Sequence, residues 1–242
     1  MTTLFISDLH LDANKPEIGQ QFLAFLDGEA RTADALYILG DLFESWVGDD
    51  DPNPHYAIIK SALRDLTDSG VPVFFMHGNR DFMIGEQFAE ETGVTILDDP
   101  ELIELHGDKV LLSHGDALCI DDKQYQQVRL MTRNPEWQAM MRAKPLQERL
   151  AFAENARKQS QEYNDSVGED DIMDVNQDAV VGTFRNRDID VLLHGHTHRP
   201  AIHTIDLEGR SSRRIVLGDW FEHGSVVRWD ATGPRLEVML RS

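Results

Sequence analysis

Five short apolar runs in this sequence each lead into side chains that can bind a metal ion. Buried strands are expected at residues 4–6, 35–39, 73–76, 110–112 and 191–193. The side chains that follow them include Asp8 and His10, Asp41, Asn79, His114, and His196 and His198. Open α/β sheets gather such side chains at the carboxyl ends of their strands. Five repetitions of one construction therefore predict an α/β fold with a metal site at one edge of the sheet.

The donor types indicate which metal chemistry to expect. Aspartate, asparagine and histidine supply oxygen and imidazole nitrogen without thiolate, a set that suits Mn²⁺, Fe²⁺ or Zn²⁺ better than a structural zinc site. Seven candidate ligands are too many for one ion. Two ions roughly 3.5–4 Å apart that share one carboxylate would use all of them. Asp41, which ends the run 35–39 after a glycine, is the best candidate for the shared carboxylate.

Between these strands the spacing of apolar residues predicts crossover helices, which imply a parallel sheet. The expected helices are 18–30, 55–69, 85–92 and 172–184. Near the carboxyl terminus, strands are expected at 201–206, 214–218, 225–229 and 235–240, as an antiparallel run that closes a second sheet. We therefore predict a two-sheet α/β sandwich with helices outside.

A helical insertion interrupts this alternation. The core is expected at 1–120 and 170–242 and a helical cap at 121–169, with helices near 124–131, 137–142 and 146–163. Eight basic and three acidic residues give 123–158 a net charge of +5, within a chain of net charge −20. Such a basic island indicates an anionic partner.

The same insertion is expected to expose more apolar side chains than a short helical insertion needs for its own packing: Leu130, Met131, Trp137, Met140, Met141, Leu146, Leu150 and Phe152. Two interpretations stay open. These side chains form a private core for the cap, or they line an adaptable groove for an anionic amphiphile or a membrane surface.

Composition limits the remaining function classes. The net charge of −20 argues against a surface made for nucleic acid. The single cysteine, Cys119, allows no intramolecular disulfide, which fits a reducing compartment. Neither a signal peptide nor a membrane span is evident in the sequence, so we expect a cytoplasmic protein.

The blocks Asp8-Leu9-His10, Gly40-Asp41, Gly78-Asn79-Arg80-Asp81, His114 and Gly195-His196-Thr197-His198 occur in the order that calcineurin-like metallophosphoesterases show. The sequence resembles that superfamily from about residue 4 to residue 199. The resemblance implies that one ion is held by Asp8, His10, Asp41 and His198, and the other by Asp41, Asn79, His114 and His196. Arg80 stands where most members have a histidine. Arginine is a poor proton donor and a good clamp for phosphate.

That arginine, together with the stretches 37–44, 48–54, 77–82, 172–177 and 194–200, is similar to one branch, the UDP-2,3-diacylglucosamine hydrolases of lipid A biosynthesis. This resemblance implies hydrolysis of the substrate's pyrophosphate by water attack at the α-phosphorus of the nucleotide, giving UMP and 2,3-diacylglucosamine 1-phosphate. It also implies a monomeric enzyme with two divalent ions, expected to be Mn²⁺. We further expect a peripheral position on the cytoplasmic face of the inner membrane.

The resemblance also implies roles for single residues. The catalytic group is expected to be Asp41, Asn79, Arg80 and His114, and the substrate is expected to contact Asn79, Arg80, Asp122, Ser160, Asn164 and His196. Weaker substrate candidates, which packing or solvated charge explains as well, are Trp46, Tyr125 and Arg157. A lysine expected just after Asn164 is missing, since position 167 is Val167; Lys158 or Arg157 is the expected substitute.

Three other functions were weighed. A general nucleotide pyrophosphatase or cyclic-nucleotide phosphodiesterase of the same superfamily would favour histidine at position 80 and need the cap less. A protein-interaction scaffold without chemistry would be expected to lose ligand histidines, and all four are present. A nuclease is suggested by the basic island alone, and the overall acidity opposes it.

Overall fold

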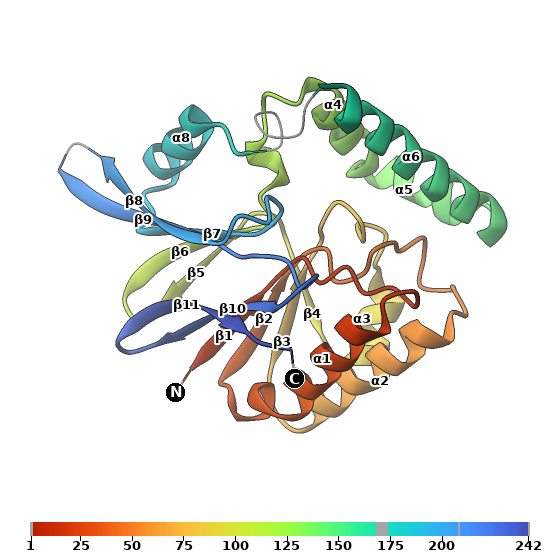
Figure 1. The fold of residues 1–242 in the computed structure, drawn as a ribbon, viewed down its shortest axis with the longest axis horizontal. Coiled ribbons are helices and arrows are strands. Elements are labelled where there is room, and N and C mark those ends of the chain that lie inside the picture. Colours follow the sequence, from red (N-terminus) through yellow and green to blue (C-terminus); the bar gives the residue numbers. More distant parts are fainter. Residues whose placement is uncertain (1, 168–173, 208, 242) are drawn as a thin grey trace.

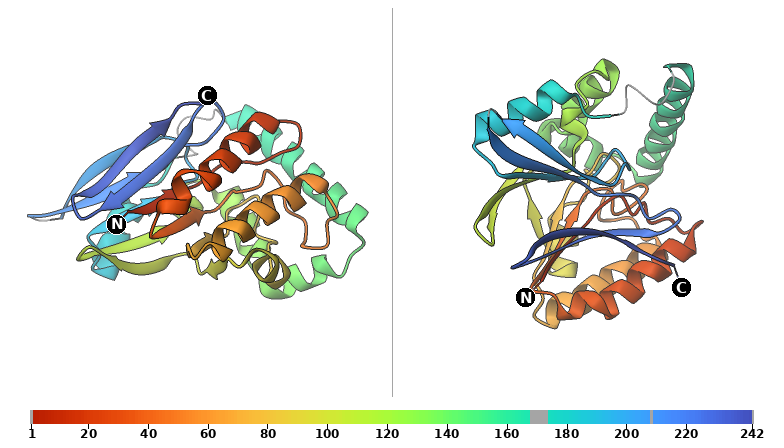
Figure 2. Two further views of the ribbon diagram at one scale, coloured as in Figure 1. Left: turned by 90° about the horizontal axis from the view of Figure 1, so that it is seen from below. Right: turned by 60° about the vertical axis from the view of Figure 1, so that its left-hand side comes forward.

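Two β-sheets lie face to face, and helices cover the outer face of each (Figure 1). The computed structural model of the chain describes residues 2–167, 174–207 and 209–241, and of residues 164–167 it describes the backbone alone. Figure 2 shows the layers in order, from the helix α8 through the second and first sheets to α1 and α2. The prediction of a two-sheet α/β sandwich is confirmed.

The first sheet has the strand order β11-β10-β1-β2-β3-β4. Its strands are β1 (Thr3–Ile6), β2 (Ala35–Leu39), β3 (Val73–Met76), β4 (Thr95–Leu97), β10 (Gly224–Asp230) and β11 (Gly233–Met239). The strands β1 to β4 are parallel, as the crossover helices predict. Leu4 and Ile6 of β1 face the outer helices, while Phe5 faces the second sheet. Both faces of this sheet are therefore apolar and covered.

The second sheet has the order β5-β6-β7-β9-β8. Its strands are β5 (Glu101–Leu105), β6 (Asp108–Ser113), β7 (Val191–His194), β8 (Ala201–Leu207) and β9 (Arg210–Val216). The strands β6, β7 and β9 are parallel, with β5 and β8 antiparallel at the edges. Leu112 and Leu193 pack between the sheets against Phe5, Leu39 and Met76.

The predicted antiparallel run of the last four strands is wrong. The hairpin β8–β9 belongs to the second sheet, but β10 crosses to the first sheet and pairs antiparallel with β1. Val226 of β10 packs among the outer helices, and Val227 and Trp229 pack between the sheets. Because β10 is apolar on both faces, it is stable only inside a sheet that is covered on both sides.

The helices α1 (Pro16–Asp27), α2 (Pro54–Asp68) and α3 (Glu86–Thr92) cover the first sheet, and α8 (Gln177–Arg187) covers the second. Two short 3₁₀ helices occur at Glu29–Thr32 and Asp116–Leu118. The helix predicted at 172–184 begins later than expected, because residues 174–176 are not helical. Residues 172–173 lie outside the described residues. Asn176 is the N-cap of α8, and its side chain accepts a hydrogen bond from the backbone of Ala179 at 3.0 Å.

Three further helices form the cap beside one end of the sandwich: α4 (Lys123–Thr132), α5 (Pro135–Arg142) and α6 (Leu146–Val167). They fall inside the range 121–169, whose last two residues lie outside the described part. Met141 of α5 is buried in the core of the first sheet, where Trp137 also packs, so the expectation that Met141 is exposed is wrong. Leu130, Met131, Met140, Leu150 and Phe152 are exposed. None of the described helices is long and apolar enough to cross a membrane.

Glycines allow the loops after β2 and β3 to approach each other closely. Gly40 has a φ of +89°, and a Cβ added there would lie 2.6 Å from Nδ1 of His114 and 2.7 Å from the backbone of Gly78. A side chain at Gly78 would in turn collide with Asp41. The rim at which the strands end therefore packs too closely to admit even a methyl group.

Gly40→Ala is expected to reduce the free energy of unfolding by about 1–3 kcal/mol more than Gly70→Ala. The backbone strain is matched, since Gly70 has a φ of +96°, but a Cβ at Gly70 meets nothing within 4 Å. Urea unfolding of the two variants measures the difference. Equal losses would show that backbone strain alone, and not contact with His114 and Gly78, makes glycine necessary at position 40.

Candidate functional site

All seven predicted ligands meet at the rim where five strands end. Asp8 and His10 follow β1, Asp41 follows β2, and Asn79 follows β3. From the second sheet, His114 follows β6, and His196 and His198 follow β7. The two sheets thus contribute to one site because their parallel strands end at the same edge.

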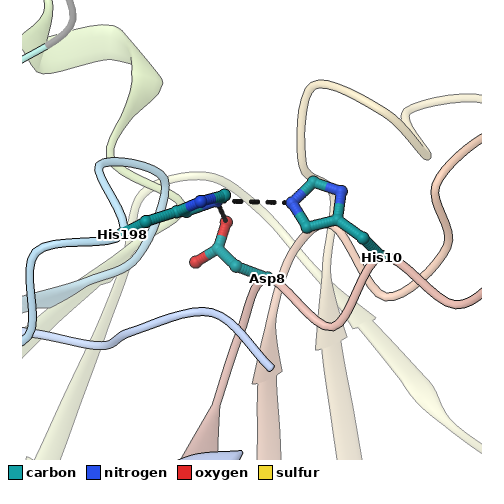
Figure 3. A group of neighbouring side chains, drawn as sticks. All are labelled: Asp8, His10 and His198. Carbon is teal, nitrogen blue, oxygen red and sulfur yellow. Dashed lines mark hydrogen bonds and ion pairs between the residues drawn. The ribbon is translucent and has the colours of Figure 1, made fainter. Parts of the chain in front are cut away.

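One group of donors consists of Asp8, His10 and His198 (Figure 3). Nε2 of His198 lies 3.4 Å from Oδ1 of Asp8 and 3.3 Å from Nε2 of His10. Asp8 Oδ1 is buried and accepts no hydrogen bond from the described residues, although Oδ2 accepts from Ser7 and from the backbone of His196. An unsatisfied carboxylate oxygen between two imidazole nitrogens fits a bound cation.

A second group consists of Asn79, His114 and His196. Oδ1 of Asn79 lies 3.0 Å from Nε2 of His114 and 3.0 Å from Nδ1 of His196. Asp41 stands between the two groups: its Oδ2 is 3.7 Å from His10 Nε2 and 3.8 Å from His114 Nε2. This carboxylate is therefore within reach of an ion in either group.

The outward-facing ring nitrogens of three histidines have partners that fix their orientation. Nδ1 of His10 is 2.9 Å from Glu44, Nδ1 of His198 is 3.4 Å from Asp219, and Nδ1 of His114 donates to the carbonyl of Leu39 at 2.9 Å. Burial alone would raise the pKa of Glu44, but His10 lowers it to about 2. Such outer partners hold ligand histidines in the tautomer that leaves the inner nitrogen for a metal.

Asp81 does not face the donors but organises the loops that carry them. It is fully buried and accepts hydrogen bonds from the backbone N–H of Leu42 at 2.7 Å and of Gly78 at 2.8 Å. Burial and the negative charge of Asp41 raise the pKa of Asp81 to about 7. Asp81 therefore joins the loop after β2 to the loop after β3.

Backbone strain is concentrated at this rim. Of the seven described non-glycine residues with positive φ, five are candidate ligands: Asp8 (56°), His10 (51°), Asp41 (52°), His196 (70°) and His198 (54°). Left-handed conformations of this kind cost on the order of 1 kcal/mol or more each and persist only where the surroundings enforce them. Here they turn successive side chains back toward one point.

The charges of the donors depend strongly on one another. Burial alone would lower the pKa of His114, but Asp41, Asp116 and Asp8 raise it to about 9. Burial would raise the pKa of Asp8, yet its close contact with His198 and the charges of His198, His114 and His10 lower it. The buried carboxylates thus attract positive charge, which a bound divalent cation can supply in place of protons.

A cavity of about 550 Å³ adjoins the donors and lies between the rim and the cap. Asn79, Arg80 and His196 line its polar end. Its wall continues over α4, α5 and α6 with the apolar side chains Val128, Met131, Trp137, Met141 and Phe152. A volume of this size suits a small-molecule ligand.

The predicted substrate residues gather around this cavity. Those that line it are Asn79, Arg80, Asp122, Ser160, His196, Trp46, Tyr125 and Arg157. Asp122 also caps α4 by accepting a hydrogen bond from the backbone of Tyr125 at 2.8 Å. The side chains of Asn164 and Val167 lie outside the described part of the chain, so the predicted contacts near them have no geometry here.

Trp46 is mainly a core residue. It is buried, it packs on Phe43 and Tyr56, and its indole N–H donates to Asp49 at 2.9 Å. Tyr125 instead lies against the site, where its ring stacks on His196 with centroids 5.9 Å apart. Of these two aromatic candidates, Tyr125 is the one in direct contact with a metal-ligand candidate.

The basic island is largely neutralised by the chain itself. Arg149 pairs with Asp50, Arg157 with Glu44, and Arg129 with Asp99 and Asp116. These pairs tie the cap to the core, and the expectation of an anionic partner for the island stays a prediction.

Asp116 is the centre of this connection. Its Oδ2 accepts a hydrogen bond from the Tyr125 hydroxyl at 2.5 Å and lies 3.0 Å from Nε of Arg129 and 3.7 Å from Arg133. Arg133 also donates to the carbonyl of Gly78 at 3.0 Å, directly before Asn79. One buried core carboxylate thus positions α4 against both His196 and the loop after β3.

Sequence reasoning assigned no role to Glu44, Asp116 or Asp219. Asp219 carried a usable signal, because Val216-Leu217-Gly218-Asp219 repeats the pattern of an apolar strand followed by Gly-Asp that identified Asp41. Glu44 and Asp116 carried none, since their roles depend on contacts with His10 and with helix α4.

Comparisons with known proteins agree with this geometry. The family model described as calcineurin-like phosphoesterase matches residues 1–200. Proteins named UDP-2,3-diacylglucosamine hydrolase are similar over the full length: those of two Stenotrophomonas maltophilia strains, R551-3 and K279a, are 53% and 52% identical and cover 100% of both chains. One from Xanthomonas oryzae pv. oryzae strain PXO99A is 52% identical, with 98% of each chain covered.

Asp116→Asn is expected to reduce the free energy of unfolding by about 2–4 kcal/mol, because it removes the buried anion that Arg129 and Arg133 share and leaves Arg129 only its pair with Asp99. The control is Asp188→Asn. Asp188 also pairs with two basic residues, Lys109 and Arg210, but it is exposed, so little change is expected. Urea unfolding compares the variants, and hydrogen exchange of the α4 amides follows the cap. A loss at Asp116 no larger than at Asp188 would contradict its role as the cap's anchor.

Proposed function

The chain belongs to the calcineurin-like phosphoesterase family, and we propose that within it the chain hydrolyses the pyrophosphate bond of UDP-2,3-diacylglucosamine. The proposed products are UMP and 2,3-diacylglucosamine 1-phosphate, and the proposed pathway is lipid A biosynthesis. These relatives match the chain from end to end, cap included.

The single observation that carries this proposal is the mixed lining of the cavity. Asn79, Arg80 and His196 line it beside the metal donors, while the cap adds the apolar side chains Val128, Met131, Trp137, Met141 and Phe152 among polar ones. The substrate is mixed in the same way, with an anionic pyrophosphate and two acyl chains. A small hydrophilic phosphodiester would leave the apolar wall without a function.

We assign two divalent ions to the rim, one to each donor group, with Asp41 between them. Oxygen and imidazole donors without thiolate support Mn²⁺. Bound there, the ions supply electrostatic stabilisation of phosphoryl oxygens and lower the pKa of a water molecule. Asp8, His10, Asp41 and His198 would hold one ion, and Asp41, Asn79, His114 and His196 the other.

Arg80 is the proposed phosphate clamp. Its Nε is buried and donates to no described group, and its backbone N–H donates to Asp41 Oδ1 at 2.8 Å. The backbone of Arg80 is thus fixed beside the shared carboxylate, and its guanidinium has a donor to offer. Since arginine stays protonated, Arg80 stabilises negative charge that develops on the phosphate and does not deliver a proton. A phosphate leaving group needs little help from an acid.

The remaining contacts select the substrate. Asp122 and Ser160, which face the cavity from both ends of the cap, are proposed to bind the glucosamine and its neighbours, together with Asn164. Tyr125 orders the ring of His196, and Arg157 offers charge near Glu44. Because Arg157 lines the cavity, it is the better placed substitute for the missing lysine.

We also place the enzyme at a membrane surface. The exposed apolar side chains of the cap support peripheral contact with the cytoplasmic face of the inner membrane, where a diacylated substrate is held. All candidate ligands come from one chain, which supports action as a monomer.

The function is tested by ³¹P NMR of Mn²⁺-loaded protein with UDP-2,3-diacylglucosamine in H₂¹⁸O, after removal of the metal. UMP is expected to carry the heavy oxygen, since water attacks the nucleotide's α-phosphorus. Heavy oxygen in the lipid phosphate would place the attack on the other phosphorus. If the substrate survives while simple phosphodiesters are cleaved, the family assignment stands and the proposed lipid substrate is wrong.

Phe152→Glu is expected to raise the KM for the lipid substrate about tenfold or more, because it places a carboxylate in the apolar wall that receives acyl chains. Hydrolysis of bis(p-nitrophenyl) phosphate should change little. The control is Leu130→Glu, which puts the same charge on an exposed cap residue that does not line the cavity. Steady-state kinetics of both variants measure the two KM values. Equal effects at the two positions would contradict the proposal that the wall around Phe152 receives acyl chains.

A further inference from the structure

A second cavity, of about 260 Å³, lies beside the loop that carries His196 and His198. Thr197, between these two histidines, is part of its wall. The other residues that line it are Asp174, Arg199, Pro200, Ala201, His203, Arg214 and Val216. Among the described residues, none lines both this cavity and the one under the cap. The proposed hydrolysis makes no use of this second cavity.

Arg214 of β9 gives the cavity its chemistry. The side chain is 5% exposed, and both Nε and Nη1 are buried without a hydrogen-bond acceptor in the described part of the chain. Burying a guanidinium without acceptors is costly, and nearly all buried donors in proteins have a partner. The donors of Arg214 therefore point to an acceptor that enters from outside the described protein atoms.

The charges around the cavity determine which acceptor fits. The one carboxylate in its wall is that of Asp174, and both of its oxygens are engaged: Oδ2 accepts from Arg199 at 3.0 Å and Oδ1 from the backbone of Val175 at 2.7 Å. Among the described residues, none forms an ion pair with Arg214. His203, opposite Arg214 in the β8–β9 pairing, and Thr197 add polar atoms.

The size and shape of the cavity agree with an oxyanion. Pro200, Ala201 and Val216 give it an apolar side, which reduces the competition from water and strengthens contacts to Arg214. Its volume is several times that of a single water molecule, which occupies about 30 Å³ in the liquid. A charged guanidinium with unsatisfied N–H donors suits the oxygens of a phosphate.

We propose that this cavity is a second anion site that binds a phosphate group through Arg214, beside the loop of His196 and His198 and separate from the metal centre. The ligand is inorganic phosphate or the phosphate of a small monoester, since both present the same oxygens to Arg214.

The test is an NMR titration of zinc-loaded, diamagnetic protein with inorganic phosphate, followed at the Nε–H signal of Arg214 and the backbone amides of Thr197 and His203. These signals are expected to shift and saturate. In Arg214→Gln, the response of Thr197 and His203 should weaken about tenfold or more, since charge-assisted hydrogen bonds are lost.

Arg213→Gln is the matched control. Arg213 is the next residue of the same strand, but it pairs with Asp108 at 2.6 Å and does not line the cavity, so phosphate should bind its variant as it binds the original protein. Asp41→Asn, which damages the metal centre, should also leave the response at Arg214 intact. A repeat with a methyl phosphate ester separates the two sources of phosphate, by showing whether the cavity accepts an attached group.

Three results would overturn the proposal. They are an Arg214 signal that phosphate does not move, a response at Thr197 and His203 that persists unchanged in Arg214→Gln, and a response that disappears in Asp41→Asn. The first can be read on the unmodified protein, so the proposal stays testable even if a variant fails to fold.

Discussion

The structure depends on holding several anionic and imidazole donors around Asp41 in a space from which water is largely excluded. Asp8, Asp41 and His114 are almost completely buried, and carboxylates in such surroundings are costly unless positive charge reaches them. Against the opposing effect of burial, Asp41, Asp116 and Asp8 accordingly raise the pKa of His114 to about 9. Divalent cations would supply the same positive charge, so the chemistry proposed here follows from the electrostatics of the rim.

The sandwich makes this concentration of charge possible. Strained residues such as Asp8 and Asp41 sit directly after strands whose side chains, among them Phe5, Ile6 and Leu39, are fully buried between apolar layers. Because the strand ends are fixed, the residues that follow them keep left-handed conformations that an unconstrained loop would not adopt. Asp81 adds hydrogen bonds that join two of these loops. Packing of the apolar layers thus offsets the energetic cost of the strained residues at the rim.

Sequence patterns predict those features that depend on residues close together in the chain. A strand, a turn and a polar side chain lie within a few residues, so the five strand ends, the seven candidate ligands and the helices of the cap could all be predicted. Features that depend on pairing between distant segments could not. The position of β10 beside β1 follows from a sheet completed after the whole chain is present, and the pairing of Arg149 with Asp50 joins residues about a hundred positions apart. A charge count over 123–158 could not reveal that pairing.

The way the cap is attached explains how its part of the cavity wall keeps a fixed position relative to the candidate metal ligands. Apolar contacts of Met141 and Trp137 bind α5 to the core, but apolar contacts alone tolerate sliding. Charged contacts are directional: Asp116 receives Tyr125 and Arg129 of α4, and Arg133 reaches the carbonyl before Asn79. Buried ion pairs often add little net stability compared with apolar residues of the same shape, yet they are expensive to break. Their value here is positional, because they fix the cap's part of the cavity wall relative to the candidate metal ligands. A shift of about 1 Å between the groups that hold a substrate and those that react with it is enough to impair catalysis.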